Sequence, residues 1–408
     1  MGLIVQKFGG TSVGSVEKIE NVASRVIEEK ERGNDVVVVV SAMGKTTDQL
    51  VKMAKEISEN PSKREMDMLL TTGEQITISL LTMALIEKGF SAISYTGWQV
   101  GITTEEVHGN ARILKIETDK IQSQLENGKI VVVAGFQGKT EKDEIATLGR
   151  GGSDTTAVAL AAALKANKCD IYTDVTGVFT ADPRIIKNAR KLDAISCDEM
   201  LELATLGAGV IHPRAVEFAK NYNVPLEVRS STEKESGTRL EEEVSLEENL
   251  IVHGLAFEDQ ITRVSINGLS NSLNSLPNVF KTLANENINV DIIIQNFSNE
   301  MTNLSFSIKS NDLKATIDIL EKGKKKFLFE NIETESGLAK VSIVGSGMVS
   351  NPGVAAEMFS ILAKEGIQIK MVSTSEIKVS TVVKDDQMVK AVESLHQAFG
   401  LSNSAVNS

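Results

Sequence analysis

The sequence is poor in cysteine and aromatic residues, carries no excess of positive charge, and has no long hydrophobic run. Its two cysteines, Cys169 and Cys197, have no metal-ligand spacing, which indicates reduced, structural thiols. The formal net charge of −12 argues against a general nucleic-acid surface, because such a surface needs a basic stripe. No apolar run approaches the roughly 18 residues of a membrane-spanning helix, and the N-terminus has no signal-like layout. We therefore expect a cytoplasmic protein that binds neither nucleic acid nor membrane.

The first 230 residues alternate between strand-like and helix-like segments. Residues 36–40 are five consecutive valines, and residues 130–134 are equally apolar. Such runs are typical of strands buried on both faces of a parallel sheet. Strands that alternate with helices over this length predict a doubly wound α/β domain.

A glycine-rich loop stands directly before an alanine-rich apolar segment, residues 157–164. The stretch Gly149–Asp154 contains three glycines and Arg150. Glycines allow close approach of a ligand to the backbone, and a helix N-terminus favours an anion. Arg150 adds a planar set of donors suited to a carboxylate or phosphate. The loop predicts an anion site, although a flexible turn that caps a helix is the plainer interpretation of the glycines alone.

Polar or glycine-rich turns also follow other predicted strands. Lys7 leads into Gly-Gly after the first strand, and Ser41 and Thr47 follow the valine run. Ligands of open α/β sheets bind at the carboxyl ends of the strands, so several such turns predict a nucleotide-phosphate site at one sheet edge. Taken singly, Lys7 reads as a surface lysine, Ser41 and Thr47 as helix caps, and Glu74 as a carboxylate stabilised in a first helical turn.

The second half of the chain repeats itself. Residues 264–268 match residues 341–345, and residues 280–288 match residues 359–367. Each copy predicts strand, loop, helix, strand, strand and helix, hence a small α+β module. A pair of such modules suits a sensor, or a duplication used for dimerisation. We predict a catalytic domain at 1–232, a polar, acidic linker at 233–262, and modules at 263–337 and 338–408.

The motifs of this chain closely resemble those of the aspartokinase family. They are Lys7–Ser12, Ser41–Asp48, Thr72–Glu74, Gly149–Thr155 and Phe179–Arg184. The resemblance covers nearly the whole chain, and the two C-terminal modules resemble ACT domains. It fits best the short, monofunctional, lysine-sensitive form. It implies an amino-acid kinase fold, an αβα sandwich with a mainly parallel sheet, followed by two ferredoxin-like ACT domains.

The same resemblance implies an activity. Family members use ATP and Mg²⁺ to phosphorylate the side-chain carboxylate of L-aspartate, giving 4-phospho-L-aspartate. This reaction is the first step toward lysine, threonine, methionine and diaminopimelate, and in this form it is feedback-inhibited by L-lysine. The resemblance also implies a homo-oligomer formed through the ACT domains, and close relatives add a separately translated ACT-only subunit.

Individual roles follow from the matching positions. Lys7 and Asp154 are expected to be catalytic, Lys7 on the transferred phosphate and Asp154 orienting Lys7; no protein metal ligand is expected. The expected nucleotide-binding residues are Lys7, Phe8, Gly9, Gly10, Thr173, Asp174, Phe179, Thr180, Ala181, Asp182, Pro183 and Arg184. The expected substrate-binding residues are Ser41, Thr47, Glu74, Arg150, Gly151, Gly152 and Ser153, with Glu74 on the α-ammonium and Arg150 on the α-carboxylate.

Two departures from the family pattern bear on the nucleotide and the effector. Relatives often have a lysine that contacts phosphate where this chain has Gly209, so another cation, such as Arg184, or a metal must cover that charge. The first ACT copy lacks the Pro-Gly turn that the second keeps at Pro352 and Gly353. We therefore expect one effector class, lysine, bound by Asn289, Val290, Asp291, Gln295, Val354, Ala355, Ser375 and Glu376.

Two alternatives stay open at the level of sequence. One is another carboxylate or carbamate kinase of the same fold. The other is a non-catalytic, ACT-containing amino-acid sensor that keeps the fold for binding, against which the intact Lys7, Glu74, Arg150 and Asp154 argue.

Overall fold

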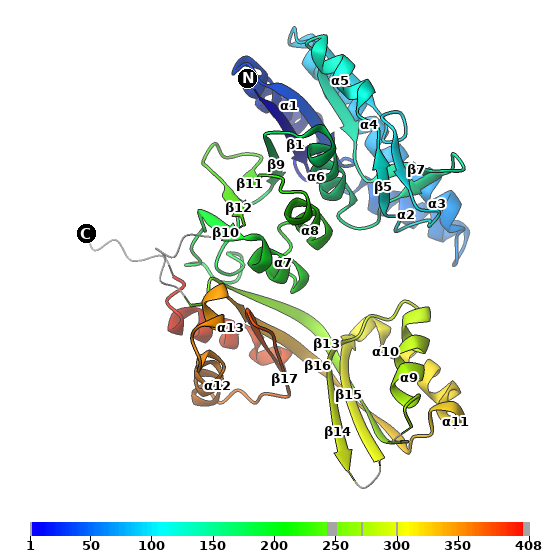
Figure 1. The fold of residues 1–408 in the computed structure, drawn as a ribbon, viewed down its shortest axis with the longest axis vertical. Coiled ribbons are helices and arrows are strands. Elements are labelled where there is room, and N and C mark those ends of the chain that lie inside the picture. Colours follow the sequence, from blue (N-terminus) through cyan, green and yellow to red (C-terminus); the bar gives the residue numbers. More distant parts are fainter. Residues whose placement is uncertain (1, 243–250, 271, 299–300, 403–408) are drawn as a thin grey trace, which may run out of the picture. The chain divides into compact units, whose positions relative to one another are not determined.

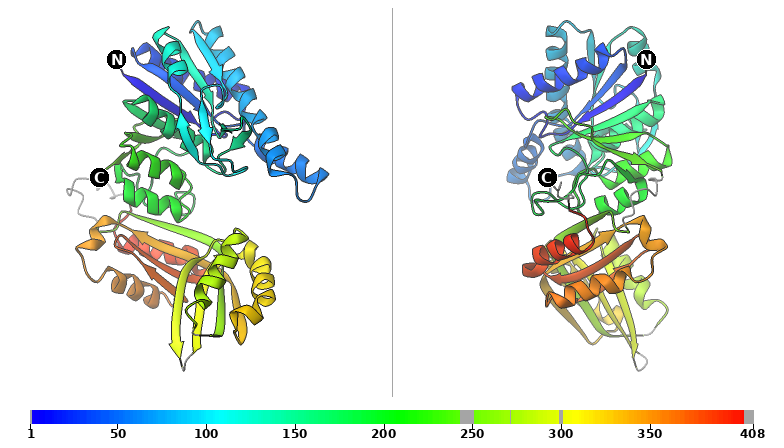
Figure 2. Two further views of the ribbon diagram at one scale, coloured as in Figure 1. Left: turned by 45° about the vertical axis from the view of Figure 1, so that its right-hand side comes forward. Right: turned by 90° about the vertical axis from the view of Figure 1, so that its left-hand side faces the viewer.

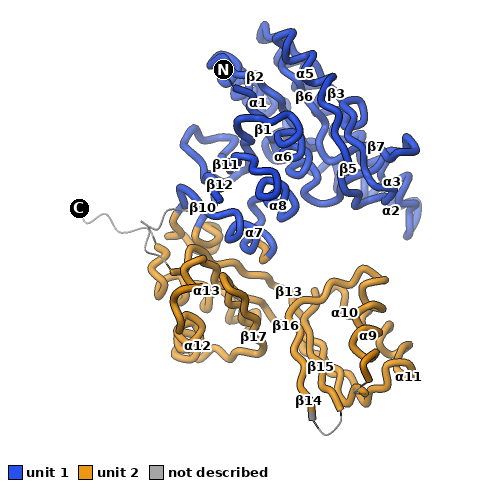
Figure 3. Tube along the Cα trace, in the orientation of Figure 1, with its two compact units in different colours: residues 1–179, 191–205, 209–247 blue, residues 180–190, 206–208, 248–408 orange. Residues whose placement is uncertain are grey.

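The structure, a computed structural model, describes residues 2–242, 251–270, 272–298 and 301–402 (Figure 1). Its contacts divide the chain into two compact units (Figure 3). The first comprises residues 1–179, 191–205 and 209–247, and the second comprises 180–190, 206–208 and 248–408. Each unit is described by itself below.

The first unit is built on an eight-stranded sheet in the order β10-β12-β11-β9-β1-β2-β6-β3. Neighbouring strands run parallel except for the antiparallel pair β11 and β12. The valine run lies in β2 at the middle of this sheet, with every one of its five side chains fully buried. The bounds are β1 Leu3–Phe8, β2 Asp35–Val40, β3 Ala92–Tyr95, β6 Ile130–Ala134, β9 Lys168–Thr173, β10 Ala194–Ser196, β11 Leu226–Ser230 and β12 Thr238–Glu241.

Helices cover both faces of this sheet. On one face, α1 (Val16–Glu31) and α4 (Thr72–Glu87) pack on alternate residues of β1, β2 and β6. α6 (Gly152–Leu164) packs on β1 and β9, and α8 (Pro213–Asn221) packs on α6 and on α7 (Cys197–Thr205). This arrangement confirms the predicted αβα sandwich. The remaining helices are α2 Thr46–Ile57, α3 Lys63–Leu70 and α5 Asp119–Glu126.

A small second sheet, which the sequence did not lead us to expect, lies within the same unit. Its order is β5-β4-β7-β8, with bounds β4 Ile102–Thr104, β5 Ile113–Ile116, β7 Gln137–Thr140 and β8 Ile145–Thr147. The chain passes from β8 into the glycine-rich loop, so this sheet helps to position that loop.

One helical stretch, Lys63–Glu87, is by length and composition apolar enough to cross a membrane. Half of its most apolar window is buried inside the protein, and the stretch is divided into α3 and α4 at Thr71. Leu81 and Leu85 of α4 are fully buried in the core of the first unit. Packing of a core helix therefore accounts for the buried half of its apolar residues, whereas Ile76, Met83 and Ile86 of α4 are exposed.

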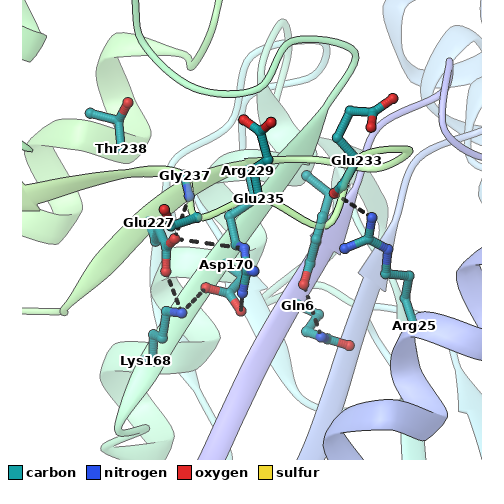
Figure 4. A network of polar contacts seen from close by, with 12 residues as sticks. Gln6, Arg25, Lys168, Asp170, Glu227, Arg229, Glu233, Glu235, Gly237 and Thr238 are labelled. Carbon is teal, nitrogen blue, oxygen red and sulfur yellow. Dashed lines mark hydrogen bonds and ion pairs between the residues drawn. The ribbon is translucent and has the colours of Figure 1, made fainter. Parts of the chain in front are cut away.

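A network of charged side chains lies on β9 and β11 (Figure 4). Lys168 lies between the carboxylates of Asp170 (2.8 Å) and Glu227, and Arg229 approaches both of these carboxylates. Burial raises the pKa of Asp170, because a charged carboxylate is poorly solvated there. The Glu227 pKa is lowered although its burial acts the other way, because Lys168 and the Gly237 backbone N–H bond to its carboxylate.

The second unit is one six-stranded antiparallel sheet in the order β14-β15-β13-β16-β18-β17. Its strands are β13 Gly254–Ser270, β14 Asp291–Ser298, β15 Met301–Lys309, β16 Asn331–Val344, β17 Met371–Thr374 and β18 Lys378–Lys384. Its α-helices are α9 Ser275–Asn285, α10 Leu313–Lys322, α11 Lys324–Phe327, α12 Val354–Lys364 and α13 Met388–Ala398.

The two predicted modules share their longest strands, β13 and β16 (Figures 1 and 2). The later part of β13, residues 261–267, pairs with the early part of β16 and with β15. The early part, residues 254–258, pairs with residues 340–344 of β16, beside β18. The second module is thus completed by residues 254–258, which lie in the predicted linker, and β16 crosses the predicted boundary at residue 337, which a repeat in sequence cannot reveal.

The predicted linker 233–262 contains regular structure at both of its ends. Residues 238–241 form β12 in the sheet of the first unit, and β13 begins at Gly254. Residues 243–250 of that predicted linker lie outside the described residues. The residues that separate the sheet of the first unit from the sheet of the second unit are therefore fewer than predicted.

Candidate active site

A cavity of about 710 Å³ opens where β1, β2 and β6 end and α6 begins. This is the carboxyl edge of the sheet, at which ligands of such folds bind. The cavity is lined by most of the predicted substrate and catalytic residues, which lie far apart in sequence. Among them are Lys7, Gly9, Gly10, Ser41, Thr47, Glu74, Arg150, Gly151, Gly152, Ser153 and Asp154.

Lys7 and Asp154 form an ion pair at the base of this cavity. The Lys7 ammonium lies 2.6 Å from Asp154 Oδ1, and both side chains are 12% exposed. Lys7 is on β1 and Asp154 is in the first turn of α6, so two rigid elements fix the pair. The His212 backbone N–H is 3.3 Å from Asp154 Oδ2. Asp154 is therefore placed to orient the Lys7 ammonium, and its role in catalysis stays a prediction.

Little space is left for a Cβ atom at the two glycines that follow Lys7 and Phe8. A Cβ at Gly10 would lie 2.9 Å from the Ala42 carbonyl oxygen, and one at Gly9 would lie 3.3 Å from Lys7 Nζ. The Gly44 N–H donates to the Gly10 carbonyl (2.9 Å), so the two loops after β1 and β2 pack backbone against backbone. The loop after β1 is thereby held at this edge, where the N–H groups of Gly9 and Gly10 can bind phosphate oxygens.

Glu74 is a buried carboxylate at the edge of the cavity. Its Oε1 accepts a hydrogen bond from the Ala42 N–H (3.0 Å), while Oε2 is buried and has no hydrogen-bond partner among the described residues. Burial raises its pKa to about 7, although bonds from the backbone N–H groups of Glu74 and Ala42 oppose that shift. Glu74 therefore joins two segments, beyond the capping role that its position in a first turn suggests.

The glycine-rich loop has the conformation that its glycines allow. Gly149 and Gly151 have φ of 76° and 65°, in the left-handed region, and α6 begins at Gly152. A Cβ at Gly151 would lie 2.1 Å from His212 Cγ. Arg150, between these glycines, is exposed and lines the cavity. Its guanidinium has no hydrogen bond or ion pair within the part of the chain that the structure describes.

Of the predicted nucleotide residues, Lys7, Gly9 and Gly10 line this cavity, whereas the others do not. The side chain of Phe8 is fully buried and stacks on Tyr172 at 4.5 Å, so only its backbone can serve a ligand. Thr173 donates to Asp174 (3.1 Å), and Asp174 lines a second cavity of about 390 Å³ beside α1. Phe179 pairs with Lys191 in a short antiparallel bridge.

Residues 180–184 belong to the second unit, by the grouping of contacts. Ala181 is buried, and Pro183 continues the turn between Asp182 and Arg184. Arg184 donates from Nε and Nη2 to the Asp182 carboxylate at 2.7–3.1 Å, which holds the pKa of Asp182 below its usual value. The positive charge predicted to replace a lysine at Gly209 is therefore already paired in this structure.

The predicted effector residues lie around the two edge strands of the second unit. Asn289 and Val290 precede β14, on which Asp291 and Gln295 lie; Val354 and Ala355 begin α12; and Ser375 and Glu376 follow β17. β14 and β17 approach each other, and Ile292 packs with Met371.

Asp291 already has an internal partner. The buried Lys340 ammonium binds the Asp291 carboxylate and lies 3.0 Å from Glu258. The predicted pairing of Asp291 with an effector ammonium would therefore require an exchange of partners.

Sequence reasoning missed Asp67, which lines the same cavity, and His212 and Arg214, which lie against the glycine-rich loop. Asp67 is the one acidic residue of the apolar stretch Met66–Leu70, and it is fully buried. His212 precedes Pro213, the first residue of α8, and accepts a hydrogen bond from the Arg214 N–H. A lone acid in an apolar helical stretch and a His-Pro-Arg helix start were the available signals.

Comparison with known proteins gives a consistent result. Residues 2–230 match the amino acid kinase family, and residues 341–399 match the ACT domain. An aspartokinase of Bacillus sp. (strain MGA3) is 74% identical over 409 residues, covering 100% of both chains. Aspartokinase 2 of Bacillus subtilis (strain 168) is 72% identical over 98% of both chains.

Solved structures agree with these relatives. E. coli aspartokinase III in complex with aspartate and ADP has a TM-score of 0.82 at 28% identity, covering 97% of this chain and 99% of that chain. The same enzyme in complex with lysine and aspartate has a TM-score of 0.76 at 27% identity over the same shares. With a family match over more than half of its residues and relatives this similar along their whole length, the chain belongs to the aspartokinases of the amino acid kinase family.

Proposed function

We propose that this aspartokinase transfers the γ-phosphoryl group of ATP to the side-chain carboxylate of L-aspartate in the cavity at the carboxyl edge of its sheet. The observation that carries the proposal is the pairing of opposite charges there. Glu74 directs a buried, unpartnered carboxylate oxygen to the cavity, while Arg150 and Lys7 bring cations to it. A free amino acid with a second carboxylate has the complementary charges.

The reaction needs no general base. A carboxylate with an ordinary pKa of about 3.9 is already ionised at neutral pH. The obstacle is its repulsion from the triphosphate, so catalysis consists of positioning and charge neutralisation. Lys7, oriented by Asp154, neutralises the transferred phosphoryl group, while Glu74 binds the α-ammonium and Arg150 the α-carboxylate. Backbone N–H groups of Gly9, Gly10 and residues 151–153, with Ser41 and Thr47, complete the site.

Mg²⁺ belongs to this proposal as an ion carried by the nucleotide. Within the described ranges there is no group of three or more histidine, cysteine or acidic side chains placed to hold a metal. Mg²⁺ in such sites is bound mainly by phosphate oxygens and water, with one or two carboxylates, so the residues present fit an ion of this kind. Asp154, the ion-pair partner of Lys7, is the acidic residue that this assignment places beside the transferred phosphoryl group. When bound, Mg²⁺ supplies further positive charge to the transferred phosphoryl group.

We propose that Thr173, Asp174 and residues 179–184 bind the nucleotide, because they match the family's nucleotide-binding positions. Arg184 is then the cation in place of the lysine absent at Gly209. Phosphate binding through Nε and Nη2, which are bidentate to Asp182, requires an exchange of partners. That exchange replaces one anion with another and leaves the guanidinium paired throughout.

We also propose feedback inhibition by L-lysine, at residues 289–291, Gln295, 354–355 and 375–376. The support is the lack of a Pro-Gly turn in the first ACT copy and the similarity to an aspartokinase solved with lysine. The effector ammonium would compete with Lys340 for Asp291. A homo-oligomer through the ACT domains, with or without a separately translated ACT-only subunit, and a cytoplasmic location complete the proposal.

Trapping of the acyl phosphate by hydroxylamine tests the function. The wild type should form hydroxamate with aspartate and ATP, and millimolar-range lysine should reduce its rate, an order-of-magnitude expectation for a metabolite effector. Product with glutamate or N-acetylglutamate but not with aspartate would favour another carboxylate kinase. Lys7→Ala should abolish product while the exposed Lys142→Ala, its control, should not. Unchanged ATP turnover in Lys7→Ala would contradict the assigned role.

A further inference from the structure

We infer that Asp67 and Arg214 are positioning residues for the aspartate site, which hold the loop that carries Arg150 against a neighbouring loop from two sides. The first loop is Thr147–Gly151, and the second is His108–Ala111. The inference rests on the proposed role of Arg150 in binding the substrate α-carboxylate. It adds Arg214, which does not line the cavity, and Asp67, which lines it but has no substrate contact in that proposal.

The two loops are packed backbone to backbone. The Ala111 N–H donates to the Thr147 carbonyl at 2.9 Å. A Cβ at Gly149 would lie 2.6 Å from Asn110 Oδ1 and 3.1 Å from the Gly109 carbonyl oxygen. Gly149 is also in the left-handed region, with φ of 76°. Arg150 therefore follows a residue whose position is set by the second loop.

Asp67 joins the loops from the side of α3. Its carboxylate is fully buried and accepts hydrogen bonds from Thr147 Oγ1 (2.6 Å), from His108 Nδ1 (2.8 Å) and from the Gly109 N–H (3.1 Å). These partners come from both loops. A buried carboxylate with this many donors is held firmly, because hydrogen bonds to a charged acceptor are stronger than neutral ones. Loss of one carboxylate oxygen would leave a donor, such as the buried Thr147 hydroxyl, without its acceptor.

Arg214 joins the same loops from the side of α8. Nη1 donates to the Leu148 carbonyl at 2.6 Å, and Nη2 donates to the Ala111 carbonyl at 3.0 Å. Nη1 also lies 3.3 Å from Asn110 Oδ1. The planar guanidinium thus binds one carbonyl of each loop at a fixed separation, which the single ammonium of lysine cannot reproduce.

Arg150 depends on this support because its own guanidinium is bound to nothing in the described part of the structure. Asp67 bonds to Thr147 and Arg214 to Leu148, two or three residues before Arg150. Loosening either contact should let Arg150 move away from the substrate carboxylate. The Lys7–Asp154 pair, fixed by β1 and α6, should be less affected. The expected signature is weaker aspartate binding with ATP binding retained.

The test uses the full-length enzyme and three variants, Asp67→Asn, Thr147→Val and Arg214→Lys. Each should raise KM for aspartate about tenfold, the cost of one unsatisfied buried group, while KM for ATP stays within about twofold. Thr147→Ser keeps the hydroxyl that bonds to Asp67, and its KM for aspartate should equal that of the wild type. Asp198→Asn and Arg239→Lys change the same residue types in exposed ion pairs and should leave KM unchanged.

A double variant and the melting temperatures distinguish a positioning role from a purely structural one. Asp67→Asn with Arg214→Lys should raise KM by less than the product of the single effects, because both act on one pair of loops. A parallel rise of both KM values, or a lower melting temperature with an unchanged KM for aspartate, would overturn the inference. Thr147→Val removes one hydroxyl and serves where Asp67→Asn does not fold. A wild type that forms no hydroxamate from aspartate would instead overturn the proposed function.

Discussion

At the scale of single residues, Glu74 shows how a binding group can oppose stability. Its carboxyl is buried with one oxygen unpartnered, and its pKa is raised to about 7. A folded-state pKa above the ordinary 4.5 means that the folded protein holds this proton more tightly than the unfolded chain. Stability therefore falls as the pH rises from about 4.5 to about 7 and is not regained above that.

Glu74→Gln should remove this dependence. The difference in the free energy of unfolding between pH 5 and pH 8 should shrink by roughly 2–3 kcal/mol in the variant, measured by urea denaturation at both pH values. The same variant should lose most of its activity, because an amide cannot neutralise the substrate ammonium. An equally steep pH dependence in wild type and variant would contradict the assignment of the raised pKa to Glu74.

The activity of the wild type should also depend on this group. In the free enzyme, protonation of Glu74 removes the negative charge that the substrate ammonium needs. kcat/KM for aspartate should therefore fall as the pH drops below about 7, measured by hydroxamate formation at several pH values. kcat/KM for ATP should fall less. A flat profile for aspartate between pH 6 and pH 8 would count against ionised Glu74 as the ammonium ligand.

Four of the predicted site residues are marked by a recognisable feature of the sequence around them. Lys7, Glu74, Arg150 and Asp154 lie beside glycines or in the first turn of an expected helix, and the structure brings all four to one cavity. Their chemical roles stay predictions. Asp67 and Arg214 act through partners that are between 41 and 104 positions away in sequence, a separation at which no local pattern exists.

At the scale of elements, the start of α6 depends on a glycine for two separate reasons. Gly151 has φ of 65°, and a Cβ there would lie 2.1 Å from His212 Cγ. Gly151→Ala should therefore cost about 2–4 kcal/mol of unfolding free energy and lower kcat/KM for aspartate. Gly89→Ala is the control, because Gly89 has φ of 87° with nothing within 4 Å and should cost only about 1 kcal/mol. Equal effects in the two variants would refute the importance of the contact with His212.

The charged network between β9 and β11 gives a second prediction at this scale. Lys168→Met leaves the carboxylates of Asp170 and Glu227 facing each other without their ammonium. The variant should lose about 3 kcal/mol of unfolding free energy near pH 8. The loss should be smaller near pH 5, because carboxylates without the ammonium have higher pKa values and become protonated there. Urea denaturation at both pH values measures this, and Lys142→Met serves as an exposed control.

Secondary structure was predictable where apolar runs are unmistakable. The valine strand β2 and the strand β6 are confirmed as central, parallel strands. β12 was missed because Thr238–Glu241 is short and polar and lies in an acidic stretch. The continuous strands β13 and β16, which join the two modules in one sheet, were missed because a repeat reports similar units and not which strands pair.

At the scale of the whole molecule, a segment of the predicted nucleotide motif is part of the second unit. The buried Thr180 hydroxyl lies 3.0 Å from the Leu401 carbonyl and 2.9 Å from His396 Nε2, and it accepts from the Arg190 N–H (3.0 Å). The Leu255 N–H donates to the Thr180 carbonyl at 2.7 Å. Asn188 donates to Ser402 at 2.9 Å. Residues 180–190 are thus held by α13 and by the residues that follow it.

Thr180→Val should weaken this arrangement. Loss of the hydroxyl leaves His396 and the Leu401 carbonyl without their buried partner, at a cost of about 2 kcal/mol. The melting temperature should fall, and KM for ATP should rise if residues 179–184 bind the nucleotide as proposed. Thr180→Ser, which keeps the hydroxyl, should behave as the wild type. A lower melting temperature with an unchanged KM for ATP would place the nucleotide elsewhere.

The path of the chain limits where this protein can be truncated or fused to part of a relative. The chain enters the second unit at residues 180–190, again at 206–208, and finally from 248 onward. A stop codon near residue 250 would remove Leu255, His396 and Leu401, the partners of Thr180. Such a truncation would therefore lose its effector response for two reasons: the ACT modules are absent, and residues 180–190 have lost their support. For the same reason, an exchange of regulatory halves between relatives at a single junction should yield mismatched hybrids unless the two short internal segments are exchanged with them.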